Sequence, residues 1–282
     1  MKILFSGCGD IGCRTANRLA AEFACFGLKR NPQTLPDSIE PLAGSMGDCA
    51  RMVEVLNQGF DIVVATLTSD SFTEEAYRRA YVDSAKTLAA AMEQSSSAPQ
   101  LVIWVSSTSV YGNNQGDWVD EQSATEPHTF SGKLLLEAEQ LITGLPCATT
   151  IVRFSGIYGP GRSRMLGQVR AGKGRPAEPQ QWSNRIHSED CAGVLAHLAR
   201  RFATGQSLQP LYLASDSEPV TQHQLRQWLA AQLKVELQEE RVEQTAIRRC
   251  SNQRLLDSGY RFIYPSYREG YQALIEALTE KS

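Results

Sequence analysis

The chain has 282 residues, of which 21% are charged, and its formal net charge is −3. A chain of this length can bury a substantial core without a metal or disulfide staple. The slight excess of acid argues against nucleic acid as a partner, because nucleic-acid-binding proteins usually carry a basic stripe. The seven cysteines are scattered and include no Cys-x-x-Cys pair, so we expect neither a disulfide framework nor a metal site.

The N-terminal residues pass directly from Met1-Lys2 into a short apolar run, with no secretory pattern before it. No run of about 18 or more apolar residues occurs in the sequence. The scattered cysteines favour a reducing compartment. We therefore expect a cytoplasmic protein that makes no membrane contact.

Short apolar runs alternate with helical patterns over the first 160 residues. Strands are predicted at 2–6, 23–28, 61–66, 101–106 and 148–154, and helices at 11–21, 49–58, 73–94 and 131–143. The run 101–106 is typical of a parallel strand that is covered on both faces. Strands that alternate with helices predict βαβ units and a parallel sheet.

The alternation weakens after residue 160. Residues 161–184, rich in Gly, Arg, Pro and Gln, are predicted to form a loop, and Ser188 is a candidate N-cap for the helix that follows. Further elements are predicted as helices at 189–202, 221–233 and 268–279 and as a strand at 211–215. The fold class is therefore α/β: a Rossmann-type doubly wound parallel sheet over 1–160, on which helix 186–202 packs, with a smaller C-terminal α/β substrate lobe mostly from 163–282.

The sequence Gly-Cys-Gly-Asp-Ile-Gly follows the first predicted strand at once and leads into a helix. Gly7 permits the tight turn, Gly9 lets the backbone approach a pyrophosphate, and Gly12 lets helix and strand pack closely. The amides at the start of the helix, with Asp10 and Ile11 among them, then face the anion. In this context the pattern predicts a dinucleotide site. The alternative is a glycine turn that serves packing only.

The end of the second predicted strand bears on the choice of cofactor. NAD-binding versions of the loop usually carry an acid about 20 residues further on, which binds the ribose hydroxyls. Lys29 and Arg30 stand there instead. Two cations suit a 2′-phosphate through charge-assisted hydrogen bonds. NADP is therefore favoured over NAD, with a solvated basic loop as the alternative interpretation.

Four other segments carry a resemblance to a known family. They are Gly47-Asp48, Ser-Ser-Thr-Ser-Val-Tyr-Gly at 106–112, Arg-Phe-Ser-Gly-Ile-Tyr-Gly-Pro-Gly-Arg at 153–162, and Arg-Ile-His-Ser-Glu-Asp at 185–190. In their order and spacing they resemble the extended short-chain dehydrogenase/reductases, the NAD(P)-dependent epimerase/dehydratase family. The resemblance covers residues 1 to about 200 and, more loosely, the rest.

The resemblance implies which side chains bind the cofactor. Asp48 would hold the adenine end, Lys133 would bond the nicotinamide ribose, and Ser155 would lie beside the nicotinamide. Thr66, at the end of the strand predicted over 61–66, is a further expected cofactor contact.

The resemblance also implies substrate contacts. Ser107 would orient the substrate carbonyl, with Thr108 beside it. Arg162 and Arg185 would face the substrate, which in this family is often a nucleotide-sugar diphosphate. Pairing with nearby acids is the alternative for the two arginines, and His187 is expected to be structural.

The family hallmark Tyr-x-x-x-Lys is incomplete in this chain. Its tyrosine moves the proton while the cofactor moves a hydride. Lys133 is present, but Thr129 occupies the tyrosine position. An aliphatic hydroxyl cannot replace a phenol, whose pKa is about 10. Tyr111 is the candidate donor because it leaves the same strand end as Ser107, and a packing residue is the alternative.

Two functions from different classes follow from these residues. The first is an NAD(P)-dependent oxidoreductase or epimerase that acts on a carbonyl or hydroxyl of a nucleotide sugar or a smaller metabolite, with Ser107, Tyr111 and Lys133 as catalytic residues. Dehydration is disfavoured, because Thr108 and Ser109 stand where the dehydratases of the family place an Asp–Glu pair. The second function is an NADP(H)-binding sensor or partner module without redox turnover.

The loss of the tyrosine favours the sensor, whereas the retained ligand-facing loops favour the enzyme. A non-redox isomerase or hydrolase with a structural cofactor is a third interpretation. The resemblance also implies a homodimer formed through helices 73–94 and 131–143.

Overall fold

The computed structural model describes residues 1–112, 115–240 and 248–279. The chain forms two compact units, and each unit is built from three separate segments. Unit 1 consists of Met1–Val110, Pro127–Arg153 and Ala192–Tyr212. Unit 2 consists of Tyr111–Glu126, Phe154–Cys191 and Leu213–Ser282. The chain thus passes between the units several times, an interleaving that the sequence does not reveal.

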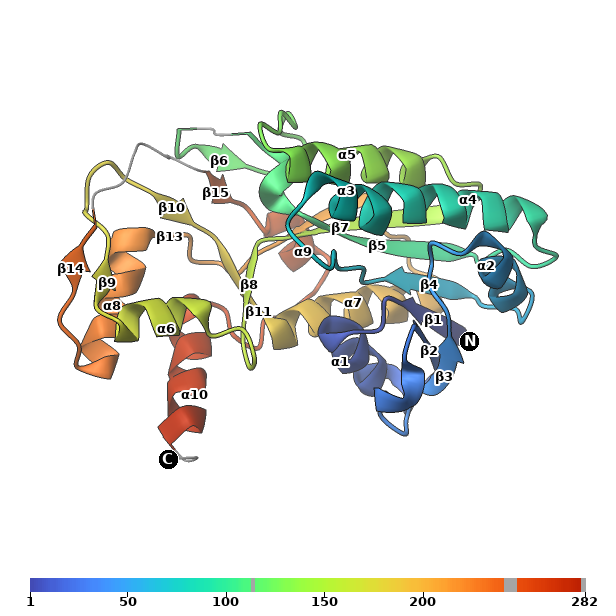
Figure 1. Ribbon diagram of the computed structural model, residues 1–282, viewed down its shortest axis with the longest axis horizontal. Helices are drawn as coiled ribbons and strands as arrows, with labels where there is room; N and C mark the ends of the chain where they lie inside the picture. Colours follow the sequence, from blue (N-terminus) through green and yellow to red (C-terminus); the bar gives the residue numbers. More distant parts are fainter. Residues whose placement is uncertain (113–114, 241–247, 280–282) are drawn as a thin grey trace. The chain divides into compact units, whose positions relative to one another are not determined.

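A seven-stranded sheet forms the centre of the Rossmann fold (Figure 1). Its strands are, in spatial order, β12 (Leu211–Ala214), β7 (Ala148–Phe154), β5 (Leu101–Ser107), β4 (Ile62–Ala65), β1 (Lys2–Ser6), β2 (Ala24–Lys29) and β3 (Glu40–Ala43). β1 pairs in parallel with β2 on one side and with β4 on the other. The predicted α/β class with a doubly wound parallel sheet is confirmed.

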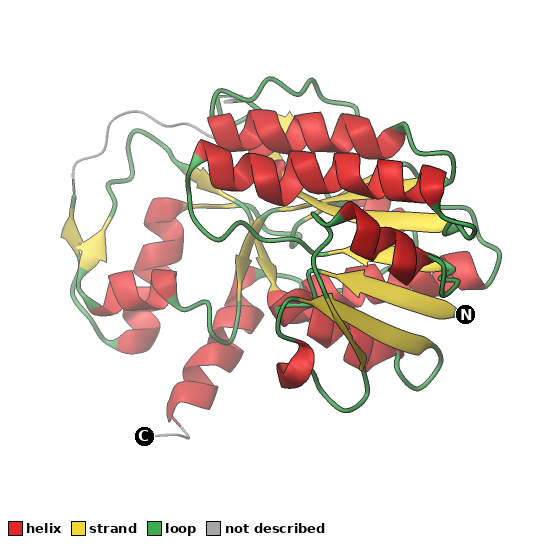
Figure 2. Ribbon diagram, turned by 45° about the vertical axis from the view of Figure 1, so that its right-hand side comes forward, coloured by secondary structure: helices red, strands yellow, loops and turns green. Residues whose placement is uncertain are grey.

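Helices cover both faces of this sheet in unit 1 (Figures 1 and 2). On one face lie α2 (Cys49–Leu56), α4 (Ser84–Gln94) and α5 (Phe130–Thr143), and on the other lie α1 (Asp10–Leu19) and α7 (Ser188–Ala203). Strands that are covered on both faces are rich in apolar side chains. In β4, for example, all four residues are buried.

The helix predicted over 73–94 contains a break in its regular geometry. It begins as α3 (Glu74–Tyr77), passes through a π-helical turn at Arg78–Asp83, and continues as α4. The hydroxyl of Ser84 donates to the carbonyl of Arg79, five residues earlier, at 3.2 Å. A π turn inserts one extra residue and redirects the side chains around it, and such turns often occur at functional sites.

A buried ion pair lies beneath α5. Arg153 on β7 and Glu139 on α5 have side chains that are each 6% exposed, and Arg153 donates to both carboxylate oxygens. The hydroxyl of Ser106 donates to the same carboxylate at 2.6 Å. Several hydrogen bonds therefore hold the charge of Glu139, which is the condition under which a buried charge is tolerated.

Unit 2 contains short elements that the sequence analysis missed. The prediction that 161–184 forms a loop is wrong, because this segment contains α6 (Arg164–Arg170), β9 (Lys173–Gly174) and β10 (Trp182–Ser183). The Gly- and Arg-rich composition hides three apolar residues of α6 that are buried, namely Met165, Leu166 and Val169. They join a cluster with side chains of α8 (Gln222–Leu233) and α10 (Tyr267–Thr279).

Four two-stranded sheets complete unit 2. β8 (Gly156–Tyr158) pairs in parallel with β11 (Arg185–His187). The others pair β10 with β13 (Val220–Thr221), β9 with β14 (Gln238–Glu239), and β6 (Trp118–Val119) with β15 (Arg249–Cys250). α9 (Gln253–Asp257) follows β15. α8 begins at a capping box in which Thr221 and Gln224 satisfy each other's backbone amides.

The predicted N-cap role of Ser188 is wrong. Its hydroxyl is buried without a hydrogen-bond partner among the described residues. The ring Nδ1 of His187 instead accepts the N–H of Glu189 at 3.2 Å, and the His187 ring packs against Tyr158 and Tyr264. The structural role expected for His187 thus includes satisfying an amide at the start of α7.

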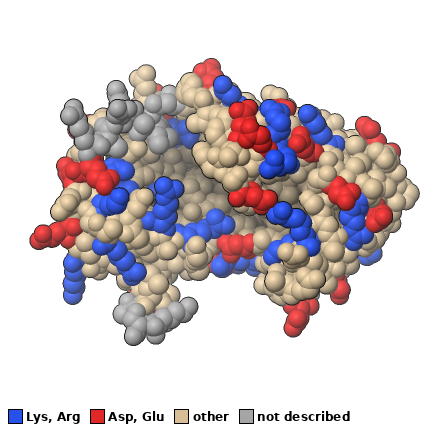
Figure 3. All heavy atoms as spheres, viewed as in Figure 1, with Lys and Arg blue, Asp and Glu red and all other residues tan. Residues whose placement is uncertain are grey.

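Acidic and basic side chains are interspersed over the visible face of the molecule (Figure 3). Within the described ranges, no helix is both long and apolar enough to cross a membrane. The same ranges hold no group of three or more His, Cys, Asp or Glu arranged for a metal ion. All seven cysteines are free.

Candidate functional site

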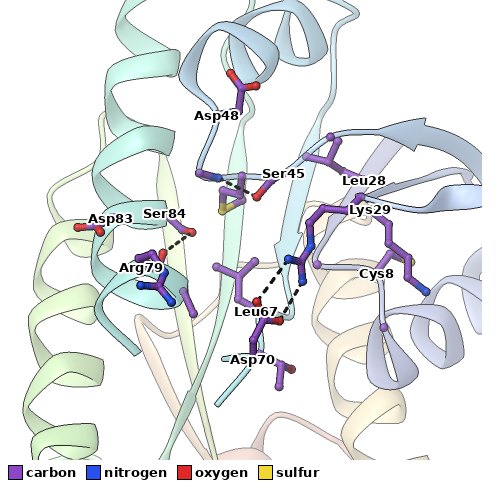
Figure 4. Close-up of a pocket in the computed structure, with 18 of the residues that line it drawn as sticks. Cys8, Leu28, Lys29, Ser45, Asp48, Leu67, Asp70, Arg79, Asp83 and Ser84 are labelled. Carbon is purple, nitrogen blue, oxygen red and sulfur yellow. Dashed lines mark hydrogen bonds and ion pairs between the residues drawn. The ribbon is translucent and has the colours of Figure 1, made fainter. Parts of the chain in front are cut away.

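Unit 1 contains a cavity of about 700 Å³ at the carboxyl ends of β1 and β2. It is bordered by the glycine loop, the end of β2, the turn at 44–48 and the π turn (Figure 4). Five predicted cofactor residues line it, namely Gly7, Gly9, Lys29, Arg30 and Asp48. This is the edge of an open α/β sheet at which ligands bind.

The glycine loop makes a tight turn and packs closely against the end of β4. Gly7 has a φ of +70°, and a Cβ there would lie 2.9 Å from Leu67. At Gly12 a Cβ would lie 2.8 Å from the hydroxyl of Thr66, so α1 packs close to the end of β4. That hydroxyl donates to the carbonyl of Gly7 at 3.0 Å. Thr66 thus supports the loop and does not line the cavity.

The N-terminus of α1 is open to an anion. Its N-cap is Gly9, and no side chain of the described chain caps it. The first-turn amides of α1, with their partial positive charge, are therefore left for a ligand. Asp10 is the acid in this turn, and Arg14 donates to its carboxylate at 2.6 Å, which offsets its charge toward a phosphate.

Two cations stand at the end of β2, as predicted. Arg30 forms two hydrogen bonds with the carboxylate of Asp70, at 2.9 and 3.3 Å, and both side chains are about 70% exposed. Lys29 donates to the hydroxyl of Thr34 at 3.0 Å. In Figure 4 Asp70, the partner of Arg30, lies across the cavity from Asp48. A pair this exposed contributes little stability, so Arg30 is available to a competing phosphate.

The wall opposite β2 comes from the π turn and was missed from the sequence. Arg79, Asp83 and Ser84 line the cavity there. Arg79 is exposed, and its charge adds to that of Arg30 in lowering the pKa of Asp70. Asp48 is the N-cap of α2 and accepts the N–H of Arg51 at 3.1 Å. The turn Gly44–Asp48 and the π turn thus form the two sides of the expected adenine end.

The candidate catalytic residues of unit 1 lie at the end of β5 and at the start of α5. The Ser107 hydroxyl accepts the N–H of Ser109 at 3.2 Å. Gly132 on α5 packs so closely that a Cβ there would lie 2.5 Å from the carbonyl oxygen of Ser109. This contact packs the start of α5 against the turn Thr108–Val110 that follows Ser107. Lys133, at the next position of α5, is exposed. Thr108 is buried in that same turn.

Thr129 is the N-cap of α5. Its hydroxyl accepts the N–H of Gly132 at 3.2 Å and lies 3.1 Å from the hydroxyl of Ser131. Where the family hallmark has a tyrosine, this chain therefore has a helix cap. A capping threonine stabilises the start of the helix that carries Lys133, which agrees with the expectation that Thr129 moves no proton.

Tyr111 lies in unit 2 with a side chain that is 2% exposed. Its hydroxyl donates to the carbonyl of Asp120 at 2.7 Å. Its own carbonyl accepts a guanidinium N–H of Arg248 at 2.8 Å. Because the phenolic proton is committed to a backbone carbonyl, this environment favours the packing role over the proton-donor role.

Unit 2 contains a second cavity, of about 360 Å³, with an unusual wall. Arg162 and Arg185, the two arginines predicted to face a substrate, both line it. The wall includes three further arginines, Arg164, Arg175 and Arg226, and none of the lining residues is an aspartate or glutamate. Burial lowers the pKa of Arg226, and the charges of Arg175 and Arg185 lower it further. Arg175 is also paired with Glu240, at 2.7 Å. The gathered positive charge would stabilise an anion in this cavity.

Several polar atoms around this arginine cavity have no hydrogen-bond partner among the described residues. They include Nε of Arg185, Nε of Arg226, Oε1 of Gln222 and the hydroxyls of Tyr158 and Tyr271. The two tyrosine rings stack with centroids 4.2 Å apart. Buried polar groups normally have partners. The two guanidinium N–H groups and the two hydroxyls can donate to acceptor oxygens of a ligand, whereas Oε1 of Gln222 would accept from a ligand donor.

Ser155, the residue expected beside the nicotinamide, is buried in unit 2 directly after β7. Its N–H donates to the carbonyl of Ala214 at 3.0 Å, and its hydroxyl has no hydrogen-bond partner in the described structure. The cofactor contacts predicted for Ser155 and Lys133 lie in different units and stay predictions.

Comparisons with known proteins show the family of the chain. The model of the family described as RmlD substrate binding domain matches residues 9–277. A solved structure from Methylobacillus flagellatus, named as an NAD-dependent epimerase/dehydratase, is 35% identical, with a TM-score of 0.83, and the match covers 99% of this chain and 98% of that one. UDP-glucuronic acid 4-epimerase from Bacillus cereus, solved with UDP-glucuronic acid and NAD, is 16% identical over the full length of both chains, with a TM-score of 0.80, and shows the same fold.

Protein YeeZ of Escherichia coli K12 is 40% identical over 98 residues, so the match spans about a third of the length of that curated relative. The parallel sheet with its glycine loop defines the class, an α/β protein with a Rossmann-type fold. The chain belongs to the NAD-dependent epimerase/dehydratase family of the extended short-chain dehydrogenase/reductases. The resemblance drawn from the sequence is thereby confirmed.

Proposed function

We propose that the chain is an NAD(P)-dependent oxidoreductase or epimerase that acts on a carbonyl or hydroxyl group of an anionic substrate such as a nucleotide sugar. The observation that carries the proposal is the unit 1 cavity, in which an uncapped helix N-terminus and the cations after β2 border one space. A diphosphate would be held by the amides of α1, and a 2′-phosphate by Arg30. The bound nicotinamide would supply or take up the hydride.

The protein's own groups would position the substrate. Ser107 would donate its hydroxyl hydrogen to the substrate oxygen, since its oxygen already accepts the N–H of Ser109. Lys133 would hold the ribose beside it. We assign the proton transfer to neither Thr129 nor Tyr111, because Thr129 is a helix cap and the Tyr111 hydroxyl is bonded to a backbone carbonyl.

The same two observations favour a second candidate function, an NADP(H)-binding sensor without redox turnover. Titration of the purified protein with NADPH, followed by cofactor fluorescence, tests binding. Oxidation of NADPH with a panel of aldehydes, ketones and nucleotide sugars tests turnover. Turnover of any member supports the enzyme, whereas binding without turnover across the panel supports the sensor. The homodimer expected through α4 and α5 stays a prediction.

Cofactor choice provides a prediction for the cations after β2. Replacement of Arg30 by alanine should weaken NADP⁺ binding about tenfold or more and leave NAD⁺ binding within about twofold, because a charge-assisted hydrogen bond is worth about 1.5–3 kcal/mol. Asp70→Asn should tighten NADP⁺ binding, since Asp70 competes with the phosphate for Arg30. Isothermal calorimetry with both dinucleotides measures this. Equal losses for the two dinucleotides in Arg30→Ala would refute a 2′-phosphate contact.

The arginine cavity provides a prediction about the substrate. Arg185→Ala should weaken binding of UDP-glucuronic acid, used as a diphosphate-bearing probe, by about tenfold or more. Arg170→Ala is the matched control, because Arg170 is exposed at the end of α6 and does not line the cavity. Binding measured by calorimetry should be unchanged in that control. A similar response in both variants would show that the cavity is not the anion site.

A further inference from the structure

Two cysteines lie together at the glycine loop. Cys8 stands between the first two glycines of the loop, is fully buried, and lines the unit 1 cavity. Cys13 lies one turn into α1 and is half-buried. Their sulfur atoms are 3.7 Å apart, at hydrogen-bond distance.

The sulfur of Cys8 packs against two glycines. A Cβ on Gly27 would lie 3.1 Å from this sulfur, and a Cβ on Gly12 would lie 3.5 Å from it. The two glycines therefore border the thiol on the β2 side and on the α1 side. A side chain at either position would crowd the sulfur that lies 3.7 Å from that of Cys13.

The surroundings also make one thiol of the pair reactive. The hydrogen bond between the two thiols lowers the pKa of Cys13, and the charge of Lys29 lowers it further. The start of a helix has the same effect on a thiol. Burial raises the pKa of Cys25, on the neighbouring strand, to about 11. Cys13 is thus the nucleophile of the group and Cys8 its nearby partner.

We propose that Cys8 and Cys13 form a redox-sensitive pair. A hydroperoxide oxidises the pair to an intramolecular disulfide, which shifts the glycine loop and weakens its binding of a dinucleotide. The effect on the cofactor rests on the proposed function, whereas the disulfide itself does not. The pair would make dinucleotide binding respond to peroxide.

The chemistry balances in two steps. The thiolate of Cys13 attacks one oxygen of hydrogen peroxide, the O–O bond breaks, and Cys13 becomes a sulfenic acid while the leaving hydroxide takes a proton to become water. The sulfur of Cys8 then attacks the sulfenic sulfur. The S–S bond forms, the S–O bond breaks, and the hydroxyl leaves with the Cys8 proton as a second water. Two thiols are oxidised and one peroxide is reduced.

The disulfide would change the loop because the sulfurs must approach from 3.7 Å to about 2.05 Å. Cys8 is part of the loop backbone, and its N–H donates to the carbonyl of Leu28 at 3.4 Å. Drawing Cys8 toward α1 would shift the amides next to Gly9, where the diphosphate would lie. We expect the oxidised protein to bind NADPH about tenfold or more weakly.

The test uses the full chain, reduced and then treated with hydrogen peroxide. Trypsin releases one peptide, residues 3–14, that contains both cysteines. Mass spectrometry should show that this peptide loses two hydrogen atoms, and NADPH titration should show weaker binding that dithiothreitol restores. Cys13→Ser should bind NADPH like the reduced wild type and keep that affinity in peroxide. Cys147→Ser, which changes a half-buried cysteine elsewhere in unit 1, should respond like the wild type.

The outcomes separate the two levels of the proposal. A peptide that retains both thiols, or that only gains oxygen, overturns the disulfide. A disulfide that leaves NADPH affinity unchanged overturns the proposed effect of the disulfide on the glycine loop. If the reduced protein binds no dinucleotide, the proposed function fails, and the mass of the peptide still decides whether the pair forms a disulfide.

Discussion

Replacement of Glu139 by glutamine is expected to lower the free energy of unfolding by about 3–5 kcal/mol. The loss arises because Arg153 stays charged with a side chain that is 6% exposed, and glutamine offers it one acceptor in place of a carboxylate. Ser106 loses its charged acceptor as well. Urea unfolding followed by circular dichroism measures the change.

Glu137→Gln is the matched control for this prediction, since Glu137 lies two residues earlier on the same helix. Its ion pair with Arg78 spans 3.4 Å between side chains that are 40% and 44% exposed, so its loss should cost at most about 1 kcal/mol. Joint replacement of Glu139 and Arg153 by leucine and methionine should recover most of the stability, because no buried charge is then left unpaired. Similar losses in Glu139→Gln and Glu137→Gln would contradict the buried pair.

The second large effect is expected at Gly12. A valine there would place its Cβ 2.8 Å from the hydroxyl of Thr66 and add two methyl groups beyond it. α1 would be forced away from β4, and the amides at its start would move with it. We expect NADP⁺ binding to weaken about a hundredfold, equivalent to ~3 kcal/mol.

Calorimetry with NADP⁺ measures this loss, and circular dichroism verifies that the variant is folded. If Gly12→Val does not fold, Gly12→Ala tests the same contact with a smaller side chain. Gly167→Ala serves as a control, because a Cβ at this position of α6 meets nothing within 4 Å. Binding by folded Gly12→Val within about twofold of the wild type would show that the loop does not hold the diphosphate.

The parts of the fold that the sequence predicts are those with strong local signals. β1, the glycine loop and α1 follow one another as apolar run, glycine pattern and amphipathic helix. β3 was missed, because Glu40-Pro41-Leu42-Ala43 has no buried run and lies at the edge of the sheet. The π turn was missed because one inserted residue barely changes the spacing of apolar side chains.

The residues of the candidate sites also fall into those that the sequence predicts and those that it does not. Gly7, Gly12 and Arg30 could be assigned because they lie at fixed positions relative to one strand and one helix. Arg175 and Arg226 could not, because only the tertiary structure brings the residue after β9 and the helix α8 to one cavity. The approach of Cys13 to Cys8 was likewise missed, since two cysteines five residues apart match no metal or disulfide pattern.

The central claim is that the start of α1 binds the diphosphate of a nicotinamide dinucleotide while Arg30 selects the 2′-phosphate. Calorimetric titration of the reduced, full-length protein with NADP⁺ and then with NAD⁺ tests it most directly. The account predicts saturable binding of both, with NADP⁺ the tighter ligand. No heat from either dinucleotide at millimolar concentration would contradict it.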